Sequence, residues 1–600
     1  MNLKGLKRII LGIVIVFVFS FLCWMQLECS SFLPIERLLS ILSIKKEYIL
    51  ETICIYISIV LFFGTLTNRF RIVSVIVSIV NTVLSVANYY VIMYHGSPLN
   101  AFEIMKIGTA ADVASNYSYV PNRDVLLLLG ITVLQLLIAV FLMPFLRGRE
   151  ALNERAVPLL SIALAIFVGA NYVATYDVDS KTSWSWIEDY SAYGTVACVK
   201  DSFISMKNLK VKPEGYSKEK LSEISLNGPS ESTKQQPDII LILNESFYDL
   251  KTAEPNIKTD KEYLEHFQSL DNAIHGFSLV PRGLGGTNES EYELLTSNTI
   301  FLLNRVVSPF MIMDLNGAGS VVSVLKKQGY ITYAMHPSSN TNYNRNVAYP
   351  AMGFDHSYFI DDFENITTIG KRGFASDAST YENLIRWYED ELKSQEESGN
   401  NQPVFMYCLT IQNHGGYETN SPEQDTVHVE NDYGEYTDDV NEYLSVLSES
   451  DKEFAKLVDY YKKSERPVYI CMMGDHSPLF TDKVIDYQSG DDYINVRKTP
   501  FVIWSNTDIE DRDEGTVNIG SLVPLMLEQA GVSIPPWYQF ILNTRESYYY
   551  YTVLPSYLDR DNKWQEPDFS KRNTFRDFLY LSYSNIMMES PENLWEVKAP

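Results

Sequence analysis

Cysteine is scarce in this chain of 600 residues, which contains only six. Cys23 and Cys54 lie in long apolar stretches, and Cys29 borders one of them. Cys408 and Cys471 lie inside short apolar runs typical of buried strands. These positions form neither a disulfide framework nor the ligand spacing of a zinc motif. The sequence therefore excludes a small disulfide-stapled scaffold.

Basic charge is also in short supply, with 49 Lys and Arg against 75 Asp and Glu and a net charge of −26. Residues 176–600 account for the deficit, because they hold 36 basic and 66 acidic residues. Such a negative surface excludes non-specific nucleic-acid binding, which needs Lys and Arg to neutralise phosphates. The composition of a disordered chain is absent too, since aromatic residues make up 13% of the sequence. No solenoid repeat is visible, so we expect a folded C-terminal part with its own core.

Charge-free stretches dominate the first 175 residues. Each is long enough for a membrane-spanning helix of about 20 residues. The stretches are 9–27, 52–68, 72–102, 125–146 and 156–176. A buried soluble helix would explain any one of them, but five in succession favour five transmembrane helices. A cleaved signal peptide is the alternative for the first, although its 19 uncharged residues exceed a usual signal core.

The basic residues around these stretches predict the orientation of the chain. Eight fall on one side: Lys4, Lys7, Arg8, Arg69, Arg71, Arg147, Arg149 and Arg155. Five fall on the other: Arg37, Lys45, Lys46, Lys106 and Arg123. The positive-inside rule then puts the N-terminus in the cytoplasm. Five spans would deliver everything after Asp177 to the extracytoplasmic side of the membrane.

The rest of the chain alternates between short apolar runs and helical segments, after a polar connector at 177–235. The runs at 238–244, 330–335, 404–411, 467–473 and 499–504 are typical of parallel strands buried on both faces. Helices are predicted at 288–299, 319–328, 376–396, 440–461 and 520–530. This alternation predicts an α/β sandwich at 236–540, followed by an aromatic and charged extension at 541–600 without a clear period.

Polar side chains follow two of the predicted strands. Glu245 comes after the run at 238–244, and Asp475 and His476 come after the run at 467–473. In open α/β sheets ligands bind at the carboxyl ends of the strands. Two carboxylates and an imidazole could hold Mn²⁺, Zn²⁺ or Mg²⁺ there. A helix cap or a solvated loop would explain any one of these residues taken alone.

Thr287 lies between a glycine-rich loop and a predicted helix. In one interpretation it is an ordinary turn residue, and Asn288 with Glu291 forms a capping box. In the other, the helix N-terminus favours a phosphate, and coordination to a metal lowers the pKa of the Thr287 hydroxyl until it can act as a nucleophile. The residues alone leave both interpretations open.

Five motifs in order make the chain resemble the lipoteichoic acid synthase family, polyglycerol-phosphate polymerases of the alkaline phosphatase and sulfatase superfamily. They are LNESF (243–247), GGTNESEYELLTS (285–297), the His-x6-Tyr-x-Arg stretch (336–345), IQNHGGY (411–417) and MMGDHSP (472–478). The resemblance implies a metal, usually Mn²⁺, held by Glu245, Thr287, Asp475 and His476, with Thr287 as the nucleophile. It also implies a substrate pocket made by His336, Tyr343, Arg345 and His414.

Some of these residues have simpler explanations when taken singly. His336 and His414 would then be core or capping histidines, and Arg345 a surface ion-pair partner. The chain also departs from the family pattern, with Tyr343 where Trp is typical and Gly-Thr-Asn-Glu-Ser-Glu in place of Lys-Thr-Ser-Asp-Ser-Glu. These departures leave the identity of the acceptor open. The C/S-x-P-x-R motif that sulfatases convert to formylglycine is absent, which disfavours sulfate ester hydrolysis.

The function implied by the resemblance is a phosphoglycerol transferase in the bacterial cytoplasmic membrane. It would move glycerol phosphate from phosphatidylglycerol to a lipoteichoic acid chain or a related envelope glycan through a Thr287 intermediate, with His414 assisting proton transfer. A phosphoethanolamine transferase or phosphodiesterase of the same superfamily is the alternative. A non-enzymatic module that binds wall polymers is a third, and the intact set of Glu245, Thr287, Asp475 and His476 argues against it.

Topology gives the first testable prediction. If the N-terminus is cytoplasmic, protease added to intact protoplasts should remove the part of the chain after Asp177, because five spans leave that part outside. Immunoblotting with one antibody against the N-terminus and one against the C-terminus measures the cleavage. Full protection of the C-terminal epitope, in protoplasts whose permeabilised counterparts are digested, would mean that the orientation is inverted.

Overall fold

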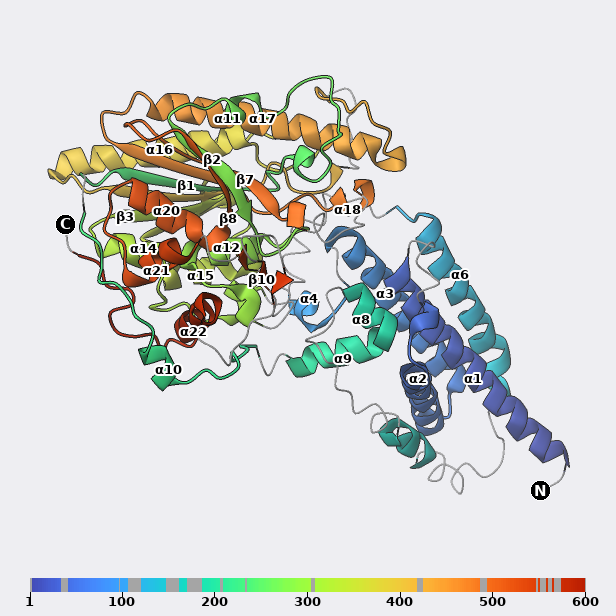
Figure 1. The fold of residues 1–600 in the computed structure, drawn as a ribbon. Helices are drawn as coiled ribbons and strands as arrows, with labels where there is room; N and C mark the ends of the chain where they lie inside the picture. Colours follow the sequence, from blue (N-terminus) through green and yellow to red (C-terminus); the bar gives the residue numbers. More distant parts are fainter. Residues whose placement is uncertain are drawn as a thin grey trace. The chain divides into compact units, whose positions relative to one another are not determined.

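The structure is a computed structural model of the whole chain (Figure 1). It describes residues 3–33, 41–95, 98–105, 120–146, 161–169, 186–205, 209–232, 235–303, 308–417, 425–485, 494–545, 549–550, 557–558, 564–565 and 573–598. The chain forms two compact units. The first comprises residues 1–105 and 119–207, and the second comprises residues 106–118 and 208–600.

Among its described residues, the first unit contains four helices that are long and apolar enough to cross a membrane. They are α1 (Leu3–Phe32), α2 (Lys46–Thr67), α3 (Phe70–His95) and α6 (Arg123–Leu137), which continues as a π-helical turn to Leu142. Shorter helices are α4 (Ala101–Met105), α8 (Trp186–Tyr193) and α9 (Thr195–Ser205). The chain is a multi-pass membrane protein, and four of the five expected spans are present. The fifth, at 156–176, lies outside the described residues except for a helical piece at 161–169.

Amide side chains link three of these helices through buried hydrogen bonds. Gln26 of α1 accepts from Asn81 of α3 at 2.7 Å and from Gln135 of α6 at 2.9 Å. Its own amide nitrogen donates to Thr132 at 2.7 Å. Hydrogen bonds of this kind hold helices together in lipid, where apolar contact alone does not favour one helix neighbour over acyl chains.

The second unit is built on one eight-stranded sheet, with the strand order β4-β3-β5-β1-β6-β7-β2-β8. The strands are β1 (Asp238–Asn244), β2 (Ala273–Leu279), β3 (Ile331–His336), β4 (His356–Phe359), β5 (Val404–Leu409), β6 (Val468–Gly474), β7 (Lys498–Ser505) and β8 (Arg512–Asn518). A small second sheet contains β9 (Tyr549–Tyr550), β10 (Tyr557–Leu558) and β11 (Trp564–Gln565). The five predicted strands are β1, β3, β5, β6 and β7.

One of the predicted parallel strands runs the other way. β7 pairs antiparallel with both β6 and β2, so the expectation that 499–504 is a parallel strand was wrong. An apolar run shows that a strand is buried on both faces, but it carries no information about the direction of the strand. β1, β3, β4, β5 and β6 are mutually parallel.

Alternate side chains of the sheet pack into two separate cores. On β1, Ile239, Leu241 and Leu243 face one core, and Ile240 and Ile242 face the other. The first core is covered by α12 (Thr287–Thr296), α14 (Val321–Lys326), α20 (Leu522–Gln529), α21 (Pro536–Thr544) and α22 (Thr574–Ile586). The second is covered by α16 (Asp377–Ser398) and α17 (Thr437–Tyr461), which lie together above the sheet in Figure 1. The predicted α/β sandwich is confirmed.

The remaining helices of this unit are short. They are α10 (Lys218–Ser222), α11 (Glu265–Gln268), α13 (Pro309–Ile312), α15 (Arg345–Met352) and α18 (Thr481–Val484). The C-terminal extension adds α22, whose Phe575, Phe578 and Leu579 are buried in the first core. The aromatic residues of α22 are therefore core residues of the same unit.

A buried carboxylate fastens the amino end of β1. Asp238 is fully buried and accepts from Arg466 Nε at 2.6 Å and from Arg466 Nη2 at 2.8 Å. Tyr388 OH and the Val404 amide also donate to this carboxylate, at 2.6 and 2.8 Å. One side chain thus joins β1 to β5, to α16 and to the segment that leads into β6.

We predict that Arg466→Ala destabilises the protein by about 3 kcal/mol, because it leaves a buried carboxylate without its countercharge. Urea unfolding of the detergent-solubilised full chain, followed by tryptophan fluorescence, would measure the change. Lys462→Ala is the matched control, since Lys462 forms an exposed ion pair with Asp459 at 3.2 Å and such pairs contribute little. An Arg466→Ala protein that unfolds at the wild-type urea concentration would contradict the role of Arg466 as the countercharge of Asp238.

Candidate active site

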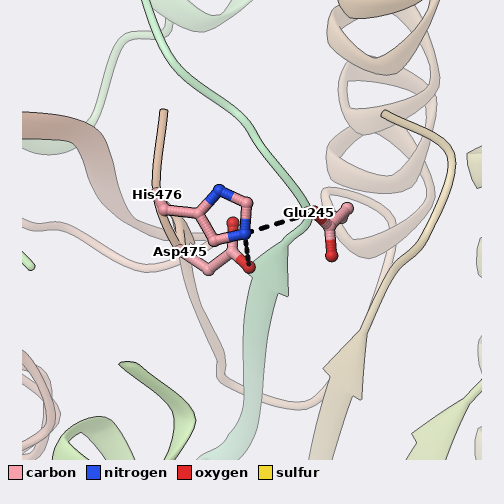
Figure 2. A group of neighbouring side chains, drawn as sticks. All are labelled: Glu245, Asp475 and His476. Carbon is pink, nitrogen blue, oxygen red and sulfur yellow. Dashed lines mark ion pairs between the residues drawn. The ribbon is translucent and has the colours of Figure 1, made fainter. Parts of the chain in front are cut away.

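Glu245, Asp475 and His476 meet at the carboxyl end of the sheet because β1 and β6 are parallel neighbours. Their register pairs Asn244 with Gly474, so the residues that follow each strand emerge side by side. His476 Nε2 lies 3.4 Å from Glu245 Oε1 and 3.2 Å from Asp475 Oδ2 (Figure 2). One ligand atom from each of the three buried residues lies within 4.8 Å of the other two.

Ser246 holds two of these side chains in place. Its backbone nitrogen donates to Asp475 Oδ1 at 2.7 Å, and its hydroxyl donates to Glu245 Oε1 at 2.9 Å. The residue adopts a left-handed backbone conformation with φ of 47°, which is uncommon for a residue other than Gly, Asn or Asp. This role of Ser246 is not predicted from the sequence, whose only signal for it is that Ser246 directly follows Glu245.

Thr287 is the first residue of α12, and its half-buried hydroxyl points at the same group. Thr287 Oγ1 lies 3.2 Å from His476 Nε2 and 3.4 Å from Glu245 Oε2. Gly285 and Gly286 precede it with φ of 67° and 102°, conformations that glycine adopts without steric cost. A Cβ at Gly286 would also lie 2.8 Å from Arg282 Cδ. The glycines therefore let the chain turn into the helix at this position.

The capping box expected at the start of α12 is not formed. The residue before the helix is Gly286, which has no side chain to cap it. Asn288 Oδ1 instead accepts from the Phe310 amide at 3.2 Å. Glu291 is fully buried and is bonded to Arg345 and Tyr349. Both side chains have tertiary partners, which a pattern of local spacing cannot reveal.

The two predicted pocket histidines follow strands β3 and β5. His336 is buried at the end of β3, with Nδ1 3.1 Å from the Leu409 carbonyl oxygen. Burial lowers the pKa of His336 well below its usual range, and the charge of Arg345 adds to the effect. His414 lies in the loop after β5, where burial lowers its pKa to about 4. Both imidazoles are therefore neutral at pH 7 in the substrate-free protein.

Arg345 is not on the surface, because its side chain is only 1% exposed. Its Nε and Nη2 atoms lie 3.0 and 2.9 Å from Glu291 Oε2. The guanidinium also lies 5.0 Å from the centre of the Tyr343 ring, and Tyr343 has a φ of 53°. The structure thus brings the predicted aromatic and arginine together and pairs the arginine with a buried carboxylate.

A comparison with family models finds a match within the second unit. A family model described as Sulfatase matches residues 237–532, which begin just before β1 and end after α20. Residues 237–532 form a sulfatase-type domain.

One curated relative of the chain is a "Putative cyclic beta-1,2-glucan modification protein" of Rhizobium meliloti (strain 1021). It is 28% identical over 420 residues, which are 67% of this chain and 62% of that protein. The chain spans less than two thirds of the length of each of the curated relatives that it matches.

Two solved structures share the fold. The Streptococcus pyogenes phosphoglycerol transferase GacH, in complex with sn-glycerol-1-phosphate, has a TM-score of 0.52 at 20% identity, covering 65% of this chain and 100% of that chain. The Neisseria meningitidis lipooligosaccharide phosphoethanolamine transferase A also has a TM-score of 0.52, at 11% identity, covering 86% of this chain and 95% of that chain. At these identities the likeness concerns the fold alone.

The sulfatase-type domain fits a divalent cation at the group formed by Glu245, Asp475 and His476. Burial raises the pKa of Asp475, and the neighbouring charge of Glu245 adds to the effect. Burial also acts to lower the pKa of His476, but Asp475 and Glu245 outweigh it and raise that pKa. One imidazole cannot neutralise two buried carboxylates, even when it is protonated. A divalent ion would supply the missing positive charge.

We predict that Mn²⁺ raises the melting temperature of the detergent-solubilised chain, since an ion present at 100 times its Kd stabilises the folded state by about 2.7 kcal/mol. The effect should shrink as the pH falls through the raised pKa of Asp475, because protons then compete with the ion for that carboxylate. Thermal unfolding with and without Mn²⁺ at several pH values measures both effects.

The matched variants separate this site from non-specific binding. Asp475→Asn and Glu245→Gln should abolish the Mn²⁺ effect, whereas Glu262→Gln should keep it, because Glu262 is exposed and pairs with Lys251. An equal Mn²⁺ effect in all three variants would show that the ion binds elsewhere.

Proposed function

We propose that this protein is a membrane-anchored phosphoglycerol transferase, which moves glycerol phosphate from phosphatidylglycerol to a lipoteichoic acid chain or a related envelope glycan. The single observation that carries the proposal is the position of Thr287 Oγ1, 3.2 Å from His476 Nε2 and 3.4 Å from Glu245 Oε2 at the start of a helix. A hydroxyl held against a candidate metal group is the arrangement expected of a nucleophile for phosphoryl transfer.

The first step forms a bond between Thr287 Oγ1 and the phosphorus of the donor, and it breaks the bond from phosphorus to the diacylglycerol oxygen. A divalent metal at Glu245, Asp475 and His476 would lower the pKa of the Thr287 hydroxyl, so that its proton would pass to solvent before the attack, and it would offset phosphate charge. The N-terminus of α12 adds a partial positive charge beside the same phosphate. The products are diacylglycerol and a glycerophospho-threonine.

The leaving diacylglycerol oxygen needs a proton, and we assign its delivery to His414. With a pKa near 4 in the substrate-free protein, His414 carries no proton to donate at pH 7. The negative charge of a bound phosphate would raise that pKa, since an opposite charge favours the protonated imidazole. Protonation of His414 would then accompany donor binding. In the second step, an acceptor hydroxyl gives its proton back to His414 and displaces Thr287.

Two similar proteins support the proposed acceptor and the proposed transferred group. The name of the curated relative from Rhizobium meliloti refers to glucan modification, which favours a glycan hydroxyl as the acceptor. The solved transferase of Streptococcus pyogenes was obtained with sn-glycerol-1-phosphate, which favours glycerol phosphate as the transferred group. In this proposal, His336, Tyr343 and Arg345 would contact that group.

Membrane anchoring suits such a donor. Phosphatidylglycerol is confined to the bilayer, so an enzyme tethered to the same membrane meets it at a raised effective concentration. In the proposed orientation the domain works at the outer leaflet. A phosphoethanolamine transferase of similar fold would meet its lipid in the same way. Membrane anchoring therefore does not distinguish the two donor head groups, and an assay must do so.

We predict that Thr287→Ala folds but loses transfer by at least ~10³-fold, because it removes the attacking oxygen. The lost hydroxyl should cost only about 1 kcal/mol of stability. The assay incubates the full chain with Mn²⁺ and vesicles of head-group-labelled phosphatidylglycerol or phosphatidylethanolamine, and it follows diacylglycerol release. Mass spectrometry of the peptide that contains Thr287 would detect the covalent intermediate.

Two variants serve as controls for this experiment. Thr287→Ser keeps a hydroxyl and should retain measurable activity. Thr296→Ala, at the other end of α12, removes a buried hydroxyl that donates to the Tyr292 carbonyl and should leave turnover nearly unchanged. Near wild-type release by a folded Thr287→Ala protein would remove the central step of the proposal, and labelling only from phosphatidylethanolamine would assign the other head group.

A further inference from the structure

Asn244, the last residue of β1, lies directly behind the candidate metal group and is fully buried. Its Oδ1 atom accepts from Thr410 Oγ1 and from Asn413 Nδ2, both at 3.2 Å. Its amide nitrogen donates to Ser450 Oγ at 3.0 Å. One small amide therefore joins the end of β1 to the loop after β5 and to α17.

The orientation of this amide is determined by its neighbours on the other side. Asp377 Oδ2 lies 3.5 Å from Asn244 Nδ2 and also accepts from Ser450 Oγ at 2.5 Å. Because the Ser450 hydroxyl gives its one proton to Asp377, it accepts from Asn244, so the nitrogen of Asn244 faces Ser450 and its oxygen faces Thr410 and Asn413. Asp377 begins α16, and its backbone nitrogen donates to Gln412 Oε1 at 2.7 Å.

The first branch of this network runs to Glu245. Pairing between β1 and β5 ends at Leu243 and Leu409. Beyond this pair, the Glu245 backbone nitrogen donates to Thr410 Oγ1 at 3.1 Å. The hydroxyl thus continues the ladder by one hydrogen bond beyond the end of the strand, and it fixes the backbone that carries the Glu245 carboxylate. Thr410 is fully buried, so water does not offer an alternative partner.

The second branch runs to His414. Asn413 is fully buried, and its carbonyl oxygen accepts from Tyr417 OH at 2.5 Å. The His414 backbone nitrogen donates to the Ile411 carbonyl at 3.1 Å, which closes a tight turn around Asn413. The bond from Asn413 Nδ2 to Asn244 is the side-chain link between this turn and β1. Its loss would release the turn from the strand that carries Glu245.

We propose that Asn244 is a positioning residue that holds Glu245 through Thr410 and the His414 turn through Asn413, so that metal ligand and proton donor keep a fixed spacing. The role of His414 in this inference rests on the proposed function, but the branch to Glu245 does not. Partners that orient metal ligands typically change metal affinity or activity by ~10–100-fold when they are removed.

The test substitutes each branch separately in the full chain. Thr410→Val removes the hydroxyl at nearly constant volume and should raise the Kd for Mn²⁺ by at least ~10-fold, with turnover recovering at saturating Mn²⁺. Asn413→Ala should lower turnover by at least ~10-fold while the Kd for Mn²⁺ changes less than about twofold. Isothermal titration with Mn²⁺ and diacylglycerol release from phosphatidylglycerol vesicles are the two readouts.

The controls distinguish positioning from plain stabilisation. Thr410→Ser keeps the hydroxyl and should restore the Mn²⁺ affinity lost in Thr410→Val. Thr380→Val removes a buried hydroxyl of α16 that donates to the Ser376 carbonyl, outside the network, and should lower only the melting temperature. Variants that unfold earlier but keep wild-type Kd and turnover in the folded protein would overturn the proposal. If the wild type releases no diacylglycerol, the proposed function fails, and the Mn²⁺ titrations of Thr410→Val and Thr410→Ser still decide the inference.

Discussion

The parallel register of β1 and β6 is the constraint on which the active site depends. It pairs Asn244 with Gly474, so that Glu245 and Asp475 leave the sheet at the same level and in the same direction. The close approach requires a glycine, because a Cβ at position 474 would lie within 2 Å of the Phe247 carbonyl oxygen. Any side chain there would push the two strand ends apart and separate the carboxylates. The ion pair between the buried Asp238 and the partly exposed Arg466 fixes the same register from the other end of β1.

Much of the candidate site was predictable from the sequence, because it depends on strand ends. The run at 238–244 coincides with β1, and apolar runs also located β5 and β6, so the residues that follow them could be identified. Direction was not predictable for β7, since a strand buried on both faces has the same composition in either direction. β8 was missed because it is a half-exposed strand with the polar sequence RDEGTVN.

The parts of the site that escaped prediction depend on contacts between distant segments. Ser246 bridges Glu245 and Asp475, which are 230 positions apart, and no local pattern records that. Asn288 and Glu291 have the spacing of a capping box, yet tertiary partners take both side chains. The aromatic extension after residue 540 has no helical period, although α22 packs in the first core. In each case a local signal competes with a longer-range contact that the sequence does not display.

The pairing of Arg345 with Glu291 changes how the phosphate of a donor could be bound. An isolated buried guanidinium would offer a full positive charge, but this one is compensated by a carboxylate 2.9 Å away. The pair can direct hydrogen bonds, but its net charge is zero, so it cannot alone offset the charge of a phosphodiester leaving water. His336 and His414 are neutral in the substrate-free protein, because burial lowers the pKa values of both imidazoles. Under the proposed function, the positive charge that first meets the donor must come from the metal group and the N-terminus of α12, because His414 gains its proton only as the donor binds. We therefore expect donor binding itself, and not only the chemical step, to depend on the divalent ion.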